Sequence, residues 1–168
     1  MDCILFRHAI AIPREEWEGD DAERPLVTKG IRKGRIAAAG LLRLGVKPTH
    51  LFSSPAARAL ETAKILRELL REMVAVKICD ELLPDAPPDK LFPELATLPE
   101  EACVLCVGHE PNLGETAGVM LFGKPTTGLV LKKAGACCIA FDGTPQAGRG
   151  TLRWWLTPSQ LRALAKKS

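Results

Sequence analysis

Hydrophobic residues along this chain fall into short continuous runs, separated by longer segments with a helical period. Four of these runs are rich in apolar and β-branched side chains, which is typical of strands buried in a sheet. They occupy residues 2–6, 50–53, 74–78 and 102–107. The run at 102–107 is apolar throughout, and we therefore expect it to lie at the centre of the sheet.

Helical periodicity follows most of these runs. Between residues 30 and 44 the apolar positions recur at a helical spacing, Thr28 stands where an N-cap is expected, and Gly45 is placed to end the helix. Ser54-Pro55 opens the next predicted helix, with proline near its first turn, and that helix runs to about residue 73. A polar, charged loop is expected from residue 12 to residue 25. Further helices are predicted at residues 89–97, 112–121 and 159–166.

The C-terminal part of the chain predicts a hairpin. Residues 136–141 and 151–156 flank a segment rich in Gly and Pro, which favours two antiparallel strands. Strands that alternate with helices predict an α/β fold, here a three-layer αβα sandwich whose central sheet is mostly parallel with an antiparallel edge. With 168 residues, 46% of them hydrophobic, residues 1–168 fit a single domain that buries roughly two-thirds of its unfolded surface.

Composition and charge exclude several classes of partner. The net charge of +3 comes from interspersed acidic and basic residues, and the chain has no Tyr and only 5% aromatic residues, so we expect no nucleic acid partner. Asp2, Arg7 and His8 interrupt what would have to be a signal-peptide core, and no run approaches the roughly 18 apolar residues of a membrane span. The sequence therefore predicts a cytoplasmic protein without a membrane partner.

The six cysteines are interpreted as small core residues. Cys103 and Cys106 have the spacing of a metal or redox pair, but they lie in a predicted strand, where positions i and i+3 face opposite sides of the sheet. Adjacent Cys137 and Cys138 face apart for the same reason. We therefore expect neither a zinc site nor disulfides, which agrees with a reducing compartment.

Two histidines and two arginines stand at comparable places relative to the predicted strands. Arg7-His8 ends the first strand, His109 follows the fourth, and Arg58 lies one turn into the helix that follows Ser54. Because ligands of such sheets bind beyond the carboxyl ends of the strands, one pocket can gather these residues. Guanidinium groups match phosphate oxygens, and a neutral imidazole can attack phosphorus. The pattern therefore indicates phosphate chemistry.

Four motifs in this order resemble the histidine phosphatase superfamily, and within it the small SixA-type phosphohistidine phosphatases. Together they span residues 5–111, and the terminal hairpin is compatible with the same family. The motifs are Leu5-Phe6-Arg7-His8-Ala9, the element Asp21-Ala22-Glu23-Arg24-Pro25-Leu26-Val27-Thr28-Lys29-Gly30, the stretch from Ser53-Ser54-Pro55 through Arg58 to Thr62-Ala63, and Val107-Gly108-His109-Glu110-Pro111. The resemblance implies a phosphoglycerate mutase-like fold.

The resemblance also implies roles for the four central residues. His8 would be the nucleophile, Arg7 and Arg58 would bind the transferred phosphoryl group, and His109 would contact that group during an in-line displacement. Such a transition state spreads charge over three oxygens, so fixed cations supply most of the stabilisation. His8 must be neutral at its attacking nitrogen, which requires the other ring nitrogen to donate a hydrogen bond. We expect the acceptor of this hydrogen bond to be a backbone carbonyl. No metal and no cofactor is expected, because the arginines replace the magnesium used elsewhere.

Further residues are candidates for supporting roles. In larger members of the superfamily a carboxylate after the third strand is the general acid; Glu81 falls there, and Asp80 and Asp85 are weaker candidates. Arg24 lies in an element that in this family enters near the pocket, and it either binds phosphate or only anchors the loop. His50 stands at the start of a strand, away from the carboxyl ends, and is interpreted as a surface or strand-cap residue.

The predicted substrate is a phosphohistidine carried on a protein. Members of the superfamily can carry large cap insertions between the third strand and His109, whereas this chain has only residues 79–101 there. An open site suits a phosphohistidine-bearing protein such as a phosphotransfer domain, and phosphate-like anions such as tungstate should compete. One alternative is a general phosphomonoesterase or mutase-like enzyme on small phosphate esters. Another is a phosphate-recognition module without catalysis.

Overall fold

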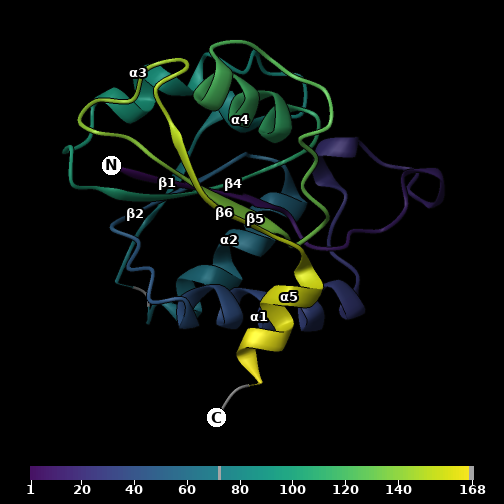
Figure 1. Cartoon of the computed structure of the whole chain (residues 1–168). Helices are drawn as coiled ribbons and strands as arrows, with labels where there is room; N and C mark the ends of the chain where they lie inside the picture. Colours follow the sequence, from purple (N-terminus) through teal and green to yellow (C-terminus); the bar gives the residue numbers. More distant parts are fainter. Residues whose placement is uncertain (72, 167–168) are drawn as a thin grey trace.

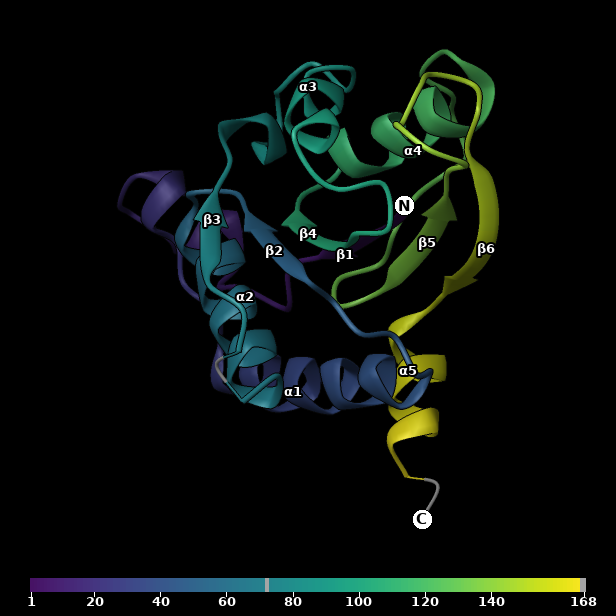
Figure 2. The ribbon, with the colours of Figure 1, turned by 90° about the vertical axis from the view of Figure 1, so that its left-hand side faces the viewer.

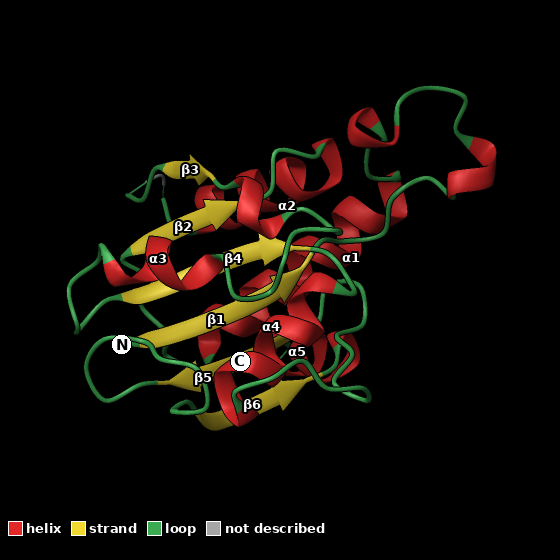
Figure 3. Cartoon of the chain, turned by 90° about the horizontal axis from the view of Figure 1, so that it is seen from above, coloured by secondary structure: helices red, strands yellow, loops and turns green. Residues whose placement is uncertain are grey.

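A six-stranded sheet forms the centre of the computed structural model, which describes residues 1–71 and 73–166. The strands lie in the order β3-β2-β4-β1-β5-β6, and in Figure 3 they are seen side by side. Their bounds are β1 Asp2–Arg7, β2 His50–Ser53, β3 Val76–Ile78, β4 Cys103–Gly108, β5 Ala136–Ala140 and β6 Thr151–Leu156. All pairings among β1 to β4 are parallel, and β5 pairs antiparallel to both β1 and β6. The mixed sheet with an antiparallel edge, and the central place of β4, are confirmed.

Helices cover both faces of this sheet (Figures 1 and 2). One face packs against α1 (Thr28–Arg43), α2 (Ala57–Leu69) and α5 (Pro158–Ala165). The other face packs against α3 (Leu91–Ala96) and α4 (Asn112–Phe122), together with the short 3-10 turn η3 (Asp80–Leu82). Each face has its own core of buried apolar side chains, which gives the expected three-layer sandwich.

The cysteines divide between these two cores as the alternation of strand side chains requires. Cys106 and Cys137 are buried in the core under α3 and α4, whereas Cys103 and Cys138 pack on the opposite face. All six cysteines are free thiols, and burial raises the pKa of Cys138 to about 12. Their interpretation as small core residues therefore agrees with the packing.

Several helix boundaries differ from the sequence-based prediction. Thr28 is the first residue of α1 and not its N-cap, which is Val27. The second helix begins at Ala57 and not at Ser54-Pro55, because Ser54 Oγ accepts the backbone N–H of Ala56 in the preceding turn. The same helix ends at Leu69, four residues before Met73, since Arg71 adopts a left-handed conformation with φ of 54°.

Two glycines shape the segments next to the carboxyl ends of the strands and at the far end of α1. A Cβ atom on Gly30 would lie 1.9 Å from the carbonyl oxygen of Ile10, so only glycine allows α1 to approach the chain that follows β1. Gly45 has a φ of 82° and follows the last turn of α1, as predicted.

The loop between β1 and α1 projects beyond the carboxyl ends of the parallel strands (Figure 3). It contains two short 3-10 turns, η1 (Arg14–Glu16) and η2 (Asp21–Glu23). An isolated bridge between Ala11 and Leu26 closes its base. No helix within residues 1–71 and 73–166 combines the length and apolar character needed to cross a membrane.

Candidate active site

Three neighbouring strands deliver the site residues to one edge of the sheet. Arg7 at the end of β1 lies in register with Gly108 at the end of β4, and the N–H of His8 donates to the carbonyl of Gly108 over 3.0 Å. The N–H of Ser54 donates to the carbonyl of Val107, also over 3.0 Å. The residues that follow these three strands are therefore held side by side by the sheet ladder itself.

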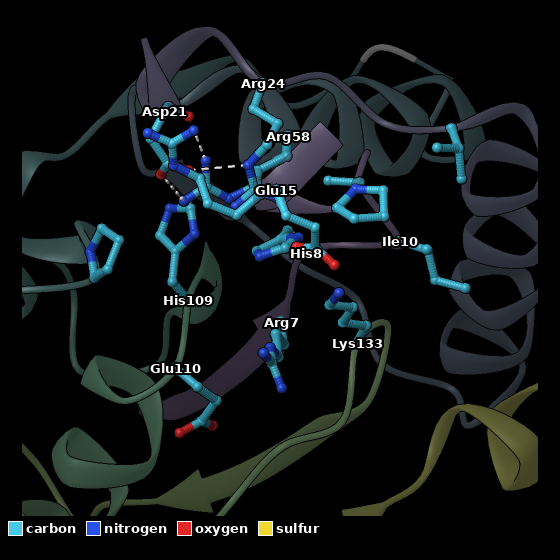
Figure 4. A pocket seen from close by; sticks show the side chains of 15 residues that line it. Arg7, His8, Ile10, Glu15, Asp21, Arg24, Arg58, His109, Glu110 and Lys133 are labelled. Atoms are coloured by element: carbon cyan, nitrogen blue, oxygen red, sulfur yellow. Dashed lines mark hydrogen bonds and ion pairs between the residues drawn. The ribbon is translucent and has the colours of Figure 1, made fainter. Parts of the chain in front are cut away.

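These residues line a cavity of about 610 Å³ at the carboxyl ends of the strands (Figure 4). The four central residues predicted from the sequence all line this cavity, namely Arg7, His8, Arg58 and His109. Arg24 lines it as well. The other lining residues come mainly from the loop between β1 and α1 and from the end of β4: they are Ile10, Ala11, Pro13, Arg14, Glu15, Asp21, Val27, Pro84, Glu110 and Lys133.

His8 is buried, and its ring orientation is fixed by the backbone. Its Nδ1 lies 2.7 Å from the carbonyl oxygen of Ala9, which can only accept, so Nδ1 carries the proton and Nε2 presents its lone pair. Burial holds the pKa of His8 well below its usual range, and the charges of Arg58 and Arg7 lower it further. The imidazole is therefore neutral at physiological pH, with a free nucleophilic nitrogen.

His109 faces His8 across a short gap. Their ring centroids lie 4.9 Å apart, with the ring planes tilted by 55°. His109 Nε2 lies 2.8 Å from the hydroxyl of Ser54, while its Nδ1 is buried without a hydrogen-bond partner among the described residues. Burial, together with the charges of Arg58 and nearby arginines, lowers the pKa of His109 to about 3. Both imidazoles are thus neutral near physiological pH.

Arg58 and Arg24 are held together by one carboxylate. Arg58 donates from Nη1 to the backbone oxygen of Asp21 over 2.7 Å and from Nη2 to its Oδ2 over 3.0 Å. Arg24 donates from Nε to the Oδ1 of the same Asp21 over 2.9 Å and from Nη1 to the carbonyl of Ile12 over 2.6 Å. Burial alone would raise the pKa of Asp21, but the hydrogen bond from Arg24 and the charge of Arg58 outweigh it and lower the pKa. Arg24 both anchors the loop and lines the cavity.

Arg7 lies at the opposite side of the rings in Figure 4, near Glu110. Its Nη1 donates to the carbonyl of Leu131 over 2.8 Å, and its Nε is buried without a partner among the described residues. Burial lowers the pKa of Arg7, and the charge of Glu110 opposes that effect. Glu110 in turn accepts the N–H of Leu131 over 2.8 Å. The guanidinium is thereby oriented by the segment that precedes β5.

Sequence reasoning missed three features of this site. Asp21 was seen only as part of a motif, and the acceptor Leu131 and the cation Lys133 come from a segment without any motif. That Asp21 joins two arginines follows from the folding of the loop, and the pattern Asp-x-x-Arg was the only signal in the sequence. A backbone carbonyl such as that of Leu131 leaves no signal at all.

The remaining candidates lie outside the cavity. Glu81 accepts a hydrogen bond from the thiol of Cys79 over 3.1 Å, and neither it nor Asp80 nor Asp85 is among the residues that line the cavity. The structure therefore does not bring Glu81 to the imidazoles. His50 stands at the start of β2 and its Nδ1 lies 2.9 Å from the hydroxyl of Thr49, which agrees with its interpretation as a strand-cap residue.

The geometry suits one kind of chemistry. A free imidazole nitrogen lies beside a second neutral imidazole, with guanidinium groups on both sides (Figure 4). Such donors are preorganised for an anion with several oxygens, and the lone pair of His8 can attack its central atom. The arrangement is therefore that of a site for transfer of a phosphate-like group.

Comparisons with known proteins agree with this reading of the geometry. An uncharacterized protein of Picosynechococcus is 35% identical over 147 residues, which cover 80% of this chain and 82% of that protein. The solved structure of the protein histidine phosphatase SixA in complex with tungstate superposes with a TM-score of 0.83 at 25% identity, over 96% of this chain and 99% of that one. A structure from Nakamurella multipartitia, named as a candidate phosphohistidine phosphatase SixA, gives a TM-score of 0.71 at 27% identity, over 94% and 95% of the two chains. No protein-family model matches the sequence.

Proposed function

Because this chain belongs to the histidine phosphatase superfamily, we propose that it is a phosphatase of the SixA type, which hydrolyses phosphohistidine on proteins through a phosphohistidine intermediate of its own. The observation that supports this most directly is the state of His8. Its Nδ1 is bound to the carbonyl of Ala9, and the ring of His109 lies 4.9 Å away. A neutral, oriented imidazole among arginines is what nucleophilic attack on a phosphoryl group requires.

In the proposed first step, Nε2 of His8 attacks phosphorus in line with the leaving nitrogen. A bond forms between Nε2 and phosphorus, and the bond between phosphorus and the imidazole of the substrate breaks, with its electron pair returning to that imidazole. The other nitrogen of the substrate ring carries a proton from solvent, so the ring leaves as neutral imidazole. In the second step water attacks the same phosphorus, inorganic phosphate leaves, and His8 is restored with its lone pair. Arg7, Arg58 and His109 would hold the three equatorial oxygens in both steps, and Arg24 would add a more distant positive charge.

The proposed chemistry needs little acid assistance. The phosphorus–nitrogen bond of phosphohistidine is labile, so the leaving imidazole departs more readily than an alcohol. This fits a cavity to which Glu81 does not contribute. A general phosphomonoesterase or mutase would need a proton donor for an alkoxide leaving group, and the position of Glu81 favours the phosphohistidine substrate over a phosphate ester.

The surroundings of the cavity also favour a substrate displayed on a protein. Between β3 and β4 the chain forms only η3 and α3, and the single residue of that stretch that lines the cavity is Pro84. This stretch therefore forms no large cap domain that could enclose a small sugar phosphate. A histidine that projects from a partner, for example from a phosphotransfer domain, would instead bring its own surface to the entrance.

The proposal is tested by two assays in parallel on the purified protein. One uses a phosphohistidine-bearing carrier protein, and the other a generic phosphate ester, both with and without a chelator. We expect kcat/KM to be much higher for the carrier and unchanged by the chelator. Activity confined to the small ester would contradict the proposed substrate, and the absence of turnover with both would favour a phosphate-recognition module.

A further inference from the structure

The turn before β5 brings a lysine to the cavity that none of the four motifs contains. Lys133 lines the cavity with the two imidazoles, and in Figure 4 its side chain extends from this turn toward the region of His8. The next residue, Ala134, donates its N–H to the carbonyl of Arg7 over 3.0 Å and to that of His8 over 3.2 Å. The backbone of this turn is therefore fastened directly to the two residues on which the proposed chemistry depends.

The backbone conformation of the turn is unusual for its sequence. Ala134 has a φ of 60°, a left-handed conformation that residues other than glycine rarely adopt. Such conformations persist where surrounding contacts hold them, and they are concentrated at binding and active sites. Here the contacts are the bonds of Ala134 to β1 and the bond from the N–H of Gly135 to the carbonyl of Lys132, over 2.7 Å. The strained turn therefore fixes the position from which the side chain of Lys133 extends.

The charges of the residues that line the cavity do not balance one another. The lining residues include the cations Arg7, Arg14, Arg24, Arg58 and Lys133, and the anions Glu15, Asp21 and Glu110, so two positive charges are left over. Asp21 contacts Arg58, Arg24 and Arg14, whereas Lys133 has no ion pair within 4.0 Å among the described residues. A phosphoryl group with a charge of about −2 restores the balance.

We propose that Lys133 is a further cationic ligand of the phosphoryl group, which it contacts through its ammonium while Arg7 and Arg58 hold other oxygens. This inference rests on the proposed function in that His8 marks the place of the phosphorus. The charged groups that act on Lys133 include Arg7 from β1, Arg24 from the loop and Arg58 from α2, which Glu15 of η1 opposes. Partial burial and the charges of these arginines lower the pKa of Lys133. A dianion that binds here relieves the repulsion between Lys133 and the arginines.

The test measures oxyanion binding, which does not depend on the identity of the substrate. Tungstate affinity is determined by calorimetry for the wild type, for Lys133→Met and for Lys133→Arg. Lys132→Met is the matched control, because it removes the same charge from the exposed neighbouring residue, which does not line the cavity. We expect binding to weaken on the order of tenfold in Lys133→Met and less than about twofold in Lys132→Met, since a hydrogen bond from a charged group is lost only in the first. Thermal unfolding of all variants reports whether each is folded.

A pH series separates a direct contact from a general effect of charge. In the wild type, tungstate affinity should fall as the pH rises through the lowered pKa of Lys133, below its ordinary 10.5, because the neutral amine no longer binds the anion. Lys133→Arg should keep most of the affinity without this alkaline decline, because a guanidinium stays protonated. Equal losses in Lys133→Met and Lys132→Met, or an unchanged decline in Lys133→Arg, would overturn the inference. Failure of the phosphohistidine assay alone would leave these binding results intact.

Discussion

The floor and the rim of the cavity are built in different ways. The floor consists of His8, Arg58 and His109, which are only 4%, 3% and 2% exposed and which come from strand ends and from the first turn of α2. The rim consists of Glu15, Asp21 and Lys133, which are more exposed and which lie in the loop between β1 and α1 and in the turn before β5.

The two regions are held in place by different contacts. The sheet fixes the backbone of His8 through the bond to Gly108, and His109 is bound to Ser54, whereas the guanidinium of Arg58 is held by Asp21 of the loop. Hydrogen bonds within the loop fix the rim, where the carboxylate of Asp21 accepts from both Arg24 and Arg58. We infer that the floor carries the chemistry and that the rim tunes the charge and the orientation of the floor groups, as Asp21 does for Arg58.

Loss of the floor nucleophile should have the largest effect. His8→Ala removes the only group that we place in covalent contact with phosphorus, so turnover should be abolished. The measurement is a single-turnover reaction with a labelled phosphohistidine carrier, stopped in alkaline denaturant. Wild-type protein should carry a base-stable, acid-labile phosphate, and the variant should carry none. Residual labelling of the variant at a wild-type rate would assign the nucleophile elsewhere.

Removal of an arginine that we place on the phosphoryl group should cost on the order of a hundredfold or more in kcat/KM, because charge on the transferring phosphoryl group loses a preorganised donor. Arg58→Ala and Arg7→Ala are compared with Arg35→Ala, which removes a half-exposed guanidinium of α1 paired with Glu68. We expect the control to retain nearly full activity. A loss of less than about fivefold in Arg58→Ala would show that this guanidinium does not bind the phosphoryl group.

Asp21 connects the two regions, because this rim residue binds the floor residue Arg58. Asp21→Ala should lower kcat/KM on the order of tenfold, since Arg58 loses a charged hydrogen-bond partner. Asp21→Asn should lose less, because its side-chain oxygen can still accept from Arg58. In an Arg58→Ala background the same Asp21→Ala change should have little further effect. Equal losses in both backgrounds would mean that Asp21 acts independently of Arg58.

The acid limb of activity should lie at lower pH than an exposed histidine would give. At an ordinary imidazole pKa of about 6.5, a change from pH 7.5 to pH 5.5 removes roughly nine-tenths of the neutral form. Burial lowers the pKa of His8, so protonation of the nucleophile, which abolishes its lone pair, requires a lower pH. We therefore expect kcat/KM to fall less than about threefold over this interval, after subtraction of spontaneous hydrolysis. A tenfold fall would contradict the buried, neutral His8.

Glu81→Gln should have the smallest effect. Glu81 contacts Cys79 and does not line the cavity, so we expect a change of about twofold or less with both a phosphohistidine carrier and a phosphate ester. A general acid typically contributes about 10²–10⁴ in rate. Loss of ester hydrolysis on that scale in Glu81→Gln, without loss of stability, would restore Glu81 as an acid and strengthen the phosphomonoesterase alternative.

The floor could be predicted from the sequence because regular structure places it. Residues that follow parallel strands meet at one edge, and His8, Ser54 and His109 each follow an apolar run. The carbonyl that orients His8 was expected in the backbone, and it belongs to Ala9. The alternation of side chains along a strand likewise predicts that Cys103 and Cys106, and also Cys137 and Cys138, lie on opposite faces of the sheet.

The contacts that loop residues make in this site could not be predicted, because they join segments far apart in sequence without a repeating pattern. Arg58 and Asp21 are separated by 37 positions, and Arg7 and Leu131 by 124. Lys133 depends on a left-handed alanine, a conformation that the residue type argues against. Both predicted ends of α2 were wrong because local contacts and backbone conformation decide them. Ser54 binds His109 before the helix begins, and a left-handed Arg71 follows its last turn.

The role of His8 as nucleophile is tested by determining which phosphohistidine isomer the trapped intermediate contains. Phosphorus NMR of the alkaline-quenched protein distinguishes a phosphoryl group on Nε2 from one on Nδ1, and peptide mass spectrometry assigns the residue. Because Nδ1 of His8 is bound to the carbonyl of Ala9, we expect the group on Nε2 of His8 alone. A phosphoryl group on Nδ1, or on a residue other than His8, would contradict the account.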